Sequence, residues 1–172
     1  MSSKAAAAVV ILAGGQGRRA GGPKALKSLF GQPLWRVMAQ HFSSTGLEPV
    51  LAVLHPSAMP AAGDLELAGV EVLAADPEAP MFASLQCGLQ QVPDGLSVFI
   101  HPVDGGLPTL AVIAALQSAH AQSVLENRHF DVWQPRIHSG QHEGRRGHPV
   151  FLAADYWPKL LLLDPATARL DR

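Results

Sequence analysis

The stretch AAAAVVILAGGQGRRAGGPKAL, from Ala5 to Leu26, joins two very different kinds of sequence. Its first nine residues are continuously apolar, which is typical of a strand buried on both faces of a parallel sheet. The rest holds five glycines, three cations and no acidic residue. Glycines let the backbone take positive φ and approach a ligand, so that its N–H groups converge on anionic oxygens. The stretch therefore predicts a phosphate-binding turn after a central strand, with an ordinary solvent-exposed loop as the alternative.

Apolar runs and helical patterns alternate along the rest of the chain. Buried strands are predicted for residues 48–54, 69–75 and 96–104, and two more for 129–137 and 147–154. Helices are predicted for residues 33–44, 81–92, 108–121 and 155–163. In the first helix, the predicted buried side consists of Leu34, Val37, Met38, His41 and Phe42. Such alternation predicts an α/β fold in three αβα layers, with a Rossmann-like, mostly parallel sheet.

Length and composition narrow the possible partners. The 172 residues predict a single domain over positions 1–172. With 13 basic and 14 acidic residues, a net charge of -1, the chain has no general attraction for nucleic acid or an anionic membrane. Any anion must therefore be bound through local geometry. Oligomeric state is left open by the sequence.

The location of the protein is predicted from its cysteines and its apolar start. Cys87 is the only cysteine, which excludes an internal disulfide and fits a reducing cytoplasm. The run from Ala5 to Ala13 is far shorter than the roughly 20 residues of a membrane span. Lys4 before this run also fits a signal-peptide core, but the following glycines and arginines make a poor cleavage region.

Two common phosphate-binding motifs match this stretch in spacing, but residues that their chemistry requires are missing. Gly15 to Ala20 satisfies the letters of the dinucleotide motif G-x-G-x-x-[GA], but no acid follows the next strand to hold a ribose. Gly17 and Gly22 have the spacing of a Walker loop. However, Pro23 intrudes before the lysine, and an alanine replaces the hydroxyl that would hold magnesium. An NAD-dependent oxidoreductase and a Walker-type NTPase are therefore disfavoured.

The glycine-rich stretch resembles the motif L-A-[AG]-G-x-x-x-R-M-G-x-x-K of nucleotidyltransferases related to the molybdenum cofactor guanylyl- and cytidylyltransferases. The matching residues are Leu12, Ala13, Gly14, Gly15, Arg19, Gly21 and Lys24, with Ala20 in place of methionine. The resemblance implies the fold of nucleotide-diphospho-sugar transferases, and a turn, including Gly17, that wraps the triphosphate of an NTP. Arg19 and Lys24 would neutralise its phosphates, and the Leu12–Ala13 backbone would read the base.

Segment 80–89, PMFASLQCGL, resembles the family's G-M-x-x-S-L-x-x-G-L, whose serine lies near the nucleotide. Ser84 is the matching residue here. Pro80 replaces the usual glycine, which makes the start of this helix uncertain on sequence grounds. An ordinary amphipathic helix, with Gly88 allowing close packing, is the alternative.

Segment 101–109, HPVDGGLPT, resembles the family's P-V-D segment at the end of the central strand. An acid at the carboxyl end of a parallel strand points into the crevice where such sheets bind ligands. Mg²⁺ prefers oxygen ligands and usually takes one or two carboxylates plus phosphate oxygens. Asp104 is therefore the predicted magnesium ligand, with a helix cap or turn residue as the alternative. Gly105–Gly106 stands where the family has proline or a small apolar pair, which predicts a looser turn.

Two later segments also resemble the family. GHPV, from Gly147 to Val150, resembles the cytidylyltransferase branch, in which Gly147 and His148 would lie near the acceptor. The tail LLLLDPATARLDR loosely resembles the family's D-x-G-A-R, so that Asp164 becomes a candidate second metal ligand and Arg169 a further candidate. His138, His142 and His148 do not have the spacing of a structural zinc site, and solvated loop histidines are the better interpretation of the first two.

The resemblance implies an enzyme that transfers NMP from an NTP to a small phosphorylated acceptor and releases pyrophosphate. Lys24, Arg19 and Asp104 would be its catalytic residues. CTP and GTP are the favoured nucleotides, and molybdopterin is the favoured acceptor. A cytidylyltransferase acting on a sugar or sugar-alcohol phosphate stays open. So does a nucleotide-binding regulatory module with weakened catalysis, because Pro80, Gly105–Gly106 and the tail all depart from the family pattern.

Overall fold

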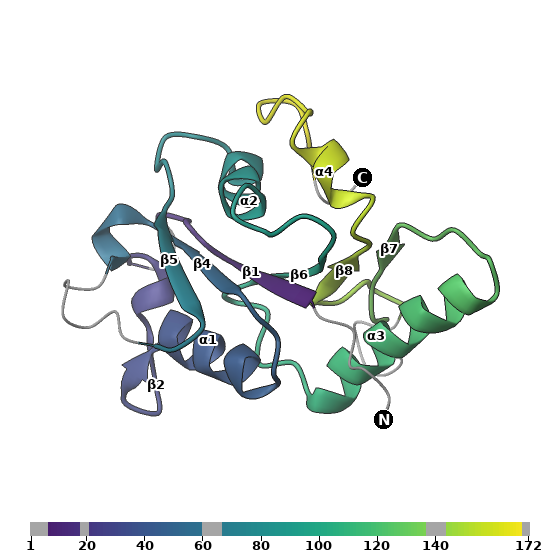
Figure 1. Cartoon of the computed structure of the whole chain (residues 1–172). Helices are drawn as coiled ribbons and strands as arrows, with labels where there is room; N and C mark the ends of the chain where they lie inside the picture. The colour runs from purple at the N-terminus through teal and green to yellow at the C-terminus, as the bar shows by residue number, and fades with distance from the viewer. Residues whose placement is uncertain (1–6, 18–20, 60–66, 137–143, 170–172) are drawn as a thin grey trace.

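The computed structural model describes residues 7–17, 21–59, 67–136 and 144–169 (Figure 1). Its centre is a six-stranded sheet with the strand order β5-β4-β1-β6-β8-β7. The strands are β1 (Ala7–Ala13), β4 (Val50–Leu54), β5 (Val70–Ala74), β6 (Ser97–Pro102), β7 (Val132–Trp133) and β8 (Val150–Leu152). β1 pairs in parallel with β4 and β6, and β4 with β5, whereas β8 is antiparallel to both of its neighbours. The predicted mostly parallel α/β sheet is confirmed.

Helices cover both faces of this sheet. The helices are α1 (Leu34–Ser44), α2 (Met81–Leu89), α3 (Leu110–Leu125) and α4 (Trp157–Leu160). In Figure 1, α1 and α3 lie below the sheet and α2 and α4 above it, so the predicted three layers are confirmed. Short 3₁₀ turns, η2 (Lys24–Leu26) and η3 (Pro56–Ala58), and a small hairpin of β2 (Ser28–Leu29) and β3 (Gln32–Pro33) complete the described elements. Within the described residues, no helix combines the length and apolar composition needed to span a membrane.

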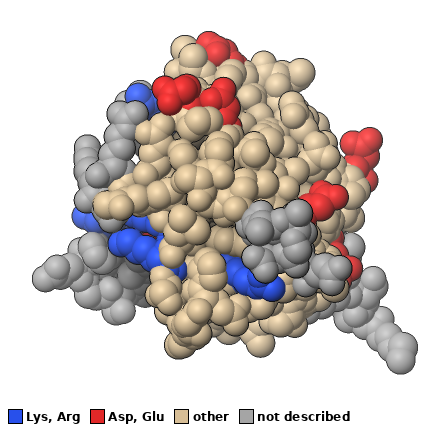
Figure 2. Space-filling model, turned by 90° about the vertical axis from the view of Figure 1, so that its left-hand side faces the viewer, with Lys and Arg blue, Asp and Glu red and all other residues tan. Residues whose placement is uncertain are grey.

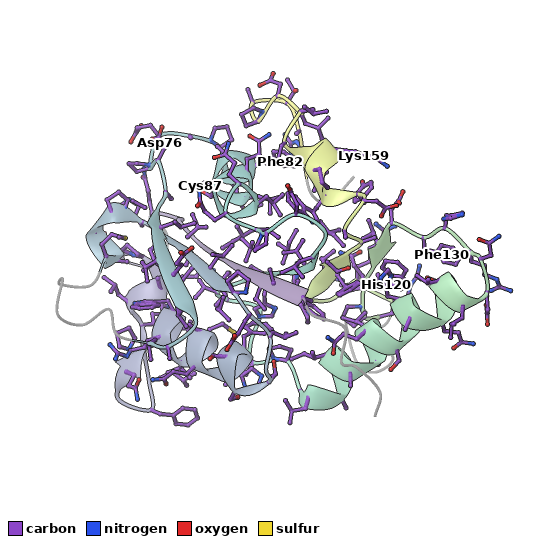
Figure 3. All side chains as sticks on the ribbon, in the orientation of Figure 1. Asp76, Phe82, Cys87, His120, Phe130 and Lys159 are labelled. Atoms are coloured by element: carbon purple, nitrogen blue, oxygen red, sulfur yellow. The ribbon has the colours of Figure 1, made fainter. Side chains whose placement is uncertain are left out.

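The central strand β1 is buried along its whole length because alternate side chains enter two separate cores. Val9 and Ile11 pack below the sheet with side chains of α1 and α3. Val10 and Leu12 pack above it with side chains of α2 and α4, among them Phe82, which points toward the sheet in Figure 3. Both faces of the strand are therefore apolar, and this explains the uninterrupted run of apolar residues in the sequence.

The prediction for α1 was right in position and only partly right in its buried face. The helix starts directly after Pro33. Its buried residues are Trp35, Met38, Ala39 and Phe42. Of the predicted buried side, Leu34, Val37 and His41 are only partly buried. The buried stripe is rotated toward Trp35 because the helix packs both on the sheet and on the η2 and hairpin region that precedes it.

Helix α2 packs directly on the sheet at Gly88, because this residue has no side chain. A Cβ at this position would lie 2.5 Å from Val10 Cγ1 and 3.1 Å from Val53 Cγ2. Both valines belong to the upper core and are fully buried. The sequence interpretation of Gly88 as a close-packing residue is therefore confirmed.

We expect Gly88→Ala to destabilise the fold by up to about 2 kcal/mol. The clash with Val10 costs about 1–3 kcal/mol in a packed core, and the better helix propensity of alanine offsets up to about 1 kcal/mol of that. Urea unfolding would measure the difference. Gly15→Ala is the matched control, because a Cβ at Gly15 meets nothing within 4 Å and its φ is not positive. An equal loss in both variants would contradict the close-packing account.

Candidate active site

The order in which strands are added to the sheet reverses at β1, and a cleft lies at the carboxyl end of this strand. From β1 the chain adds β4 and β5 on one side and β6 on the other. In open α/β sheets, ligands bind in the crevice beyond the carboxyl ends of the strands at such a switch point. Here a cleft of about 360 Å³ has walls made of the ends of β1 and β6, the glycine turn, and the start of α2. Its lining includes Leu12, Ala13, Gly14, Gly15, Gly17, Lys24, Ser84 and Asp104.

The turn after β1 is shaped by glycines and anchored at its side. Gly17 has a φ of 61° and accepts a hydrogen bond from Gly22 N at 3.2 Å, which closes the turn on itself. A Cβ at Gly17 would overlap the carbonyl of Gly22, so only glycine fits. Gln16 Nε2 donates to the carbonyl of Pro77 at 2.8 Å and so ties the turn to the segment before α2. Arg19 lies outside the described residues, and its assigned roles stay predictions.

Ser84 reaches the turn because Gly14 has no side chain. A Cβ at Gly14 would lie 2.9 Å from Ser84 Oγ and 2.7 Å from Ala75 Cβ. Ser84 is buried in the first turns of α2 and lines the cleft. The helix starts immediately after Pro80, whose carbonyl accepts from Ala83 N at 2.9 Å. Proline in place of the family's glycine thus leaves the start of α2 intact.

An ion pair joins the two predicted catalytic residues that the structure describes. Lys24 Nζ lies 2.6 Å from Asp104 Oδ2, and both side chains are about half exposed, 45% and 50%. Lys24 starts η2, and Asp104 follows β6, so the pair connects segments 80 residues apart. The hydrogen bond from Lys24 lowers the pKa of Asp104 below its ordinary value, although partial burial opposes this shift. Asp104 is therefore ionised at neutral pH and faces the cleft.

His101 holds the turn that carries Asp104, a role that the sequence analysis missed. The imidazole is fully buried at the end of β6, and its Nε2 lies 2.8 Å from the carbonyl oxygen of Gly106. Since the carbonyl only accepts, Nε2 carries the proton and donates. Gly105 packs over the ring, where a Cβ would lie 3.0 Å from His101 Cε1, and its N–H donates to Pro102 O at 2.9 Å. The expectation of a looser turn at Gly105–Gly106 was wrong, because these contacts fix it.

A bulge next to β8 places His148 beside His101. Trp133 pairs with Phe151, and the next pair is Arg136 with Arg146. From one pair to the next, the β7 side moves by three residues and the β8 side by five. The two additional residues lie in the β8 segment, around His148, and bulges of this kind redirect side chains. The rings of His148 and His101 are 6.1 Å apart. Partial burial lowers the pKa of His148, and the nearby carboxylate of Asp104 opposes that shift.

The other predicted residues lie at different places. Gly147 precedes His148 and donates its N–H to Pro135 O at 2.7 Å. Asp164 is not among the residues that line the cleft. Its carboxylate instead accepts from Ala166 N at 3.0 Å and from Thr167 Oγ1 at 3.3 Å, in the turn after α4. The structure therefore does not bring Asp164 together with Asp104, and its role as a ligand stays a prediction. His138 and His142 lie outside the described residues.

The charged side chains are not gathered into one large field on the described surface. On the face of the molecule in Figure 2, basic and acidic side chains form small separate groups on a mostly uncharged surface. Within the described residues, no group of three or more histidine, cysteine or acidic side chains could hold a metal by itself. An ion at Asp104 would therefore depend on a ligand for most of its coordination.

Comparisons with known proteins agree with this architecture. A sequence profile described as the MobA-like NTP transferase domain matches residues 9–171. A search among curated proteins gave no match. Rv0371c from Mycobacterium tuberculosis H37Rv has a similar structure, with a TM-score of 0.75 and 18% identity, over 96% of this chain and 81% of that chain.

Two further solved structures are similar. For a nucleotidyl transferase from a Methanothermobacter species, the TM-score is 0.63 at 20% identity, over 94% of this chain and 77% of that chain. For Rv0371c from Mycobacterium tuberculosis H37Rv in complex with manganese, the TM-score is 0.61 at 16% identity, over 91% and 75%. At these identities the structural matches show a shared fold.

We expect His101→Gln to flatten the pH dependence of stability, because Gln keeps a donor toward Gly106 and does not titrate. Burial, the largest effect, lowers the pKa of His101 from 6.5 to about 4. A lowered histidine pKa stabilises the fold above pH 6.5, and this stability is lost as the pH falls toward 4. Urea unfolding at pH 7 and 4.5 should show about 2–3 kcal/mol less pH-dependent loss in the variant. His101→Leu, which lacks the donor, is the comparison at pH 7 and should be the less stable of the two. A pH dependence equal to the wild type would contradict this account.

Proposed function

The chain belongs to the MobA-like NTP transferase domain family, and from this premise we propose that it transfers NMP from CTP or GTP to a phosphorylated acceptor such as molybdopterin. In this reaction an oxygen of the acceptor attacks the α-phosphorus of the NTP. The bond from the α-phosphorus to the bridging oxygen breaks, and pyrophosphate leaves with that electron pair. The acceptor oxygen loses any proton it carries to solvent.

The observation that supports this proposal most strongly is the Lys24–Asp104 pair above the glycine turn. A cation, a carboxylate and a turn of backbone N–H groups line one cleft at the switch point of the sheet. Phosphoryl and nucleotidyl transfers are catalysed mainly by positioning and by stabilising charge, and these groups supply both functions. The turn would hold the β- and γ-phosphates, and Lys24 would neutralise charge that builds up on the leaving pyrophosphate.

Asp104 fits a divalent cation. Its carboxylate is ionised, about half exposed and directed at the cleft, and it is held in place by the turn that His101 fixes. Mg²⁺ is commonly bound by one or two carboxylates, with waters and phosphate oxygens completing its coordination. When bound, the ion would draw charge from the α-phosphate and the leaving group. The manganese complex of the mycobacterial structural neighbour supports a divalent metal for this chain as well.

The acceptor side is proposed from the position of His148. The GHPV segment that resembles the cytidylyltransferase branch lies beside His101, and His148 is close enough to Asp104 to interact with it electrostatically. An acceptor bound along this segment would lie near Asp104, which would hold the metal. The opening motif resembles the guanylyl branch and the GHPV segment the cytidylyl branch, so both nucleotides belong to the proposal.

We expect one NTP to raise the melting temperature strongly in the presence of Mg²⁺. At a ligand concentration of 100 Kd, the stabilisation is about 2.7 kcal/mol, which corresponds to roughly 5–11 °C for a chain of this size. CTP, GTP, ATP, UTP and NADH would be compared with and without the metal. Stabilisation by NADH without metal would contradict the transferase, and NTP binding without pyrophosphate release for any acceptor would favour the regulatory module.

We expect Lys24→Ala and Asp104→Ala each to reduce turnover at least about a hundredfold, because the loss of one group that stabilises developing charge typically has this effect. Pyrophosphate release, with the nucleotide that the melting experiment identifies, would measure it. Lys27→Ala is the matched control, since Lys27 is exposed and does not line the cleft. Near-normal rates in both cleft variants, with folding retained, would rule out the assigned roles.

A further inference from the structure

Two arginines face each other across the ladder that continues β7 and β8. Arg136 and Arg146 form an isolated antiparallel bridge, so their side chains leave the same face of the ladder from directly opposite positions. Like charges in this arrangement repel and are destabilising. Among the described residues, no carboxylate forms a salt bridge with either arginine. An anion that joins the two guanidinium groups would relieve this repulsion.

A hollow at the surface contains this pair. It has a volume of about 320 Å³ and is lined by Val132, Gln134, Arg136 and Arg146. Val132 begins β7, and Gln134 and Arg136 follow it at every second position on the way to the bridge. Two guanidinium groups and one side-chain amide thus surround the hollow. Guanidinium groups donate planar, paired hydrogen bonds, which match phosphate and carboxylate oxygens.

The ladder that carries the pair is firmly anchored. Trp133 packs against Phe151 with ring centroids 5.6 Å apart, and His120 of α3 packs against Trp133 at 4.7 Å. Figure 3 shows His120 between α3 and this edge of the sheet. Nearer the arginines, Gly147 N donates to Pro135 O at 2.7 Å. The two arginines therefore extend from a fixed backbone.

The hollow also lies close to the candidate active site. Arg146 is two residues from His148 along the chain, and this length of backbone spans at most about 7 Å. His148 is the residue that the bulge places beside His101 and near Asp104. In the sheet the pair lies beyond β6, next to β8 and β7, whereas the glycine turn and Lys24 follow β1.

We propose that Arg136 and Arg146 form a subsite that binds a phosphate or carboxylate group of the acceptor. This proposal rests on the proposed nucleotidyl transfer for the identity of its ligand. The acceptor would then contact the protein at two places, His148 and the arginine pair. The proposal also requires that the acceptor carry an anionic group. The triphosphate is assigned to the glycine turn and is not bound by this pair.

The first test is stability in inorganic phosphate at low ionic strength. Without phosphate, Arg136→Gln and Arg146→Gln should each raise the melting temperature by about 1–3 °C, because each removes the repulsion. Phosphate should stabilise the wild type more than either variant and should shift the Nε–Hε resonances of both arginines. Arg128→Gln is the matched control, because it removes the same charge from a residue that is paired with Glu126 at 3.3 Å. Equal phosphate stabilisation of the wild type and the pair variants, or unshifted resonances, would overturn the subsite.

The second test separates the acceptor from the nucleotide. Binding of the preferred NTP with Mg²⁺ should be unchanged in Arg136→Gln and Arg146→Gln, whereas Lys24→Ala should weaken it. Weaker NTP binding in the pair variants would overturn the assignment to the acceptor and place the arginines in the triphosphate site. If no NTP binds the wild type, the proposed function fails, while the phosphate measurements still decide whether the arginine pair binds anions.

Discussion

Parallel pairing of β1 with β4 on one side and β6 on the other is the constraint on which the site depends. It buries every residue of β1 and leaves the carboxyl end of the strand open at the place where the sheet changes direction. The chain must then turn away sharply beside Ser84 and Ala75, and only glycine at position 14 leaves room for this. The same pairing places the end of β6, and hence Asp104, next to that turn. The glycine turn and the acid are therefore neighbours because of the sheet topology.

Much of this arrangement could be predicted from local sequence. A continuously apolar run, a glycine-rich turn and an acid after a later strand are each visible in a few consecutive residues, and topology rules bring the ends of the strands together. Lys24 and Asp104 were identified in this way, and the structure places them 2.6 Å apart. The exact buried face of α1 was less predictable, because the position of Trp35 depends on a hairpin whose packing no local pattern encodes.

The missed features depend on contacts between segments or on strand register. His101 in the sequence is one histidine at the end of an apolar strand, and only the structure shows its bond to Gly106. The signal that could have identified it is Gly105, since the imidazole ring beneath this turn leaves little room for a Cβ at that position. The redirection of His148 follows from a register difference between β7 and β8, which a single sequence does not contain. Asp164 was selected by a loosely matching motif, and its carboxylate hydrogen-bonds within its own turn, so that its role as a metal ligand stays a prediction.

The Lys24–Asp104 pair also suggests how a chain with a net charge of -1 would bind a triphosphate at the proposed site. An isolated cation at the cleft would attract anions, and an isolated carboxylate would repel them. In the ion pair, the two charges compensate each other, and because both side chains are about half exposed, neither is strongly desolvated. In the proposed reaction, Asp104 would hold the metal and Lys24 would hold phosphate oxygens of the triphosphate. One ion pair would thus be replaced by two, and the Lys24–Asp104 contact already holds both side chains at the cleft that would bind the nucleotide.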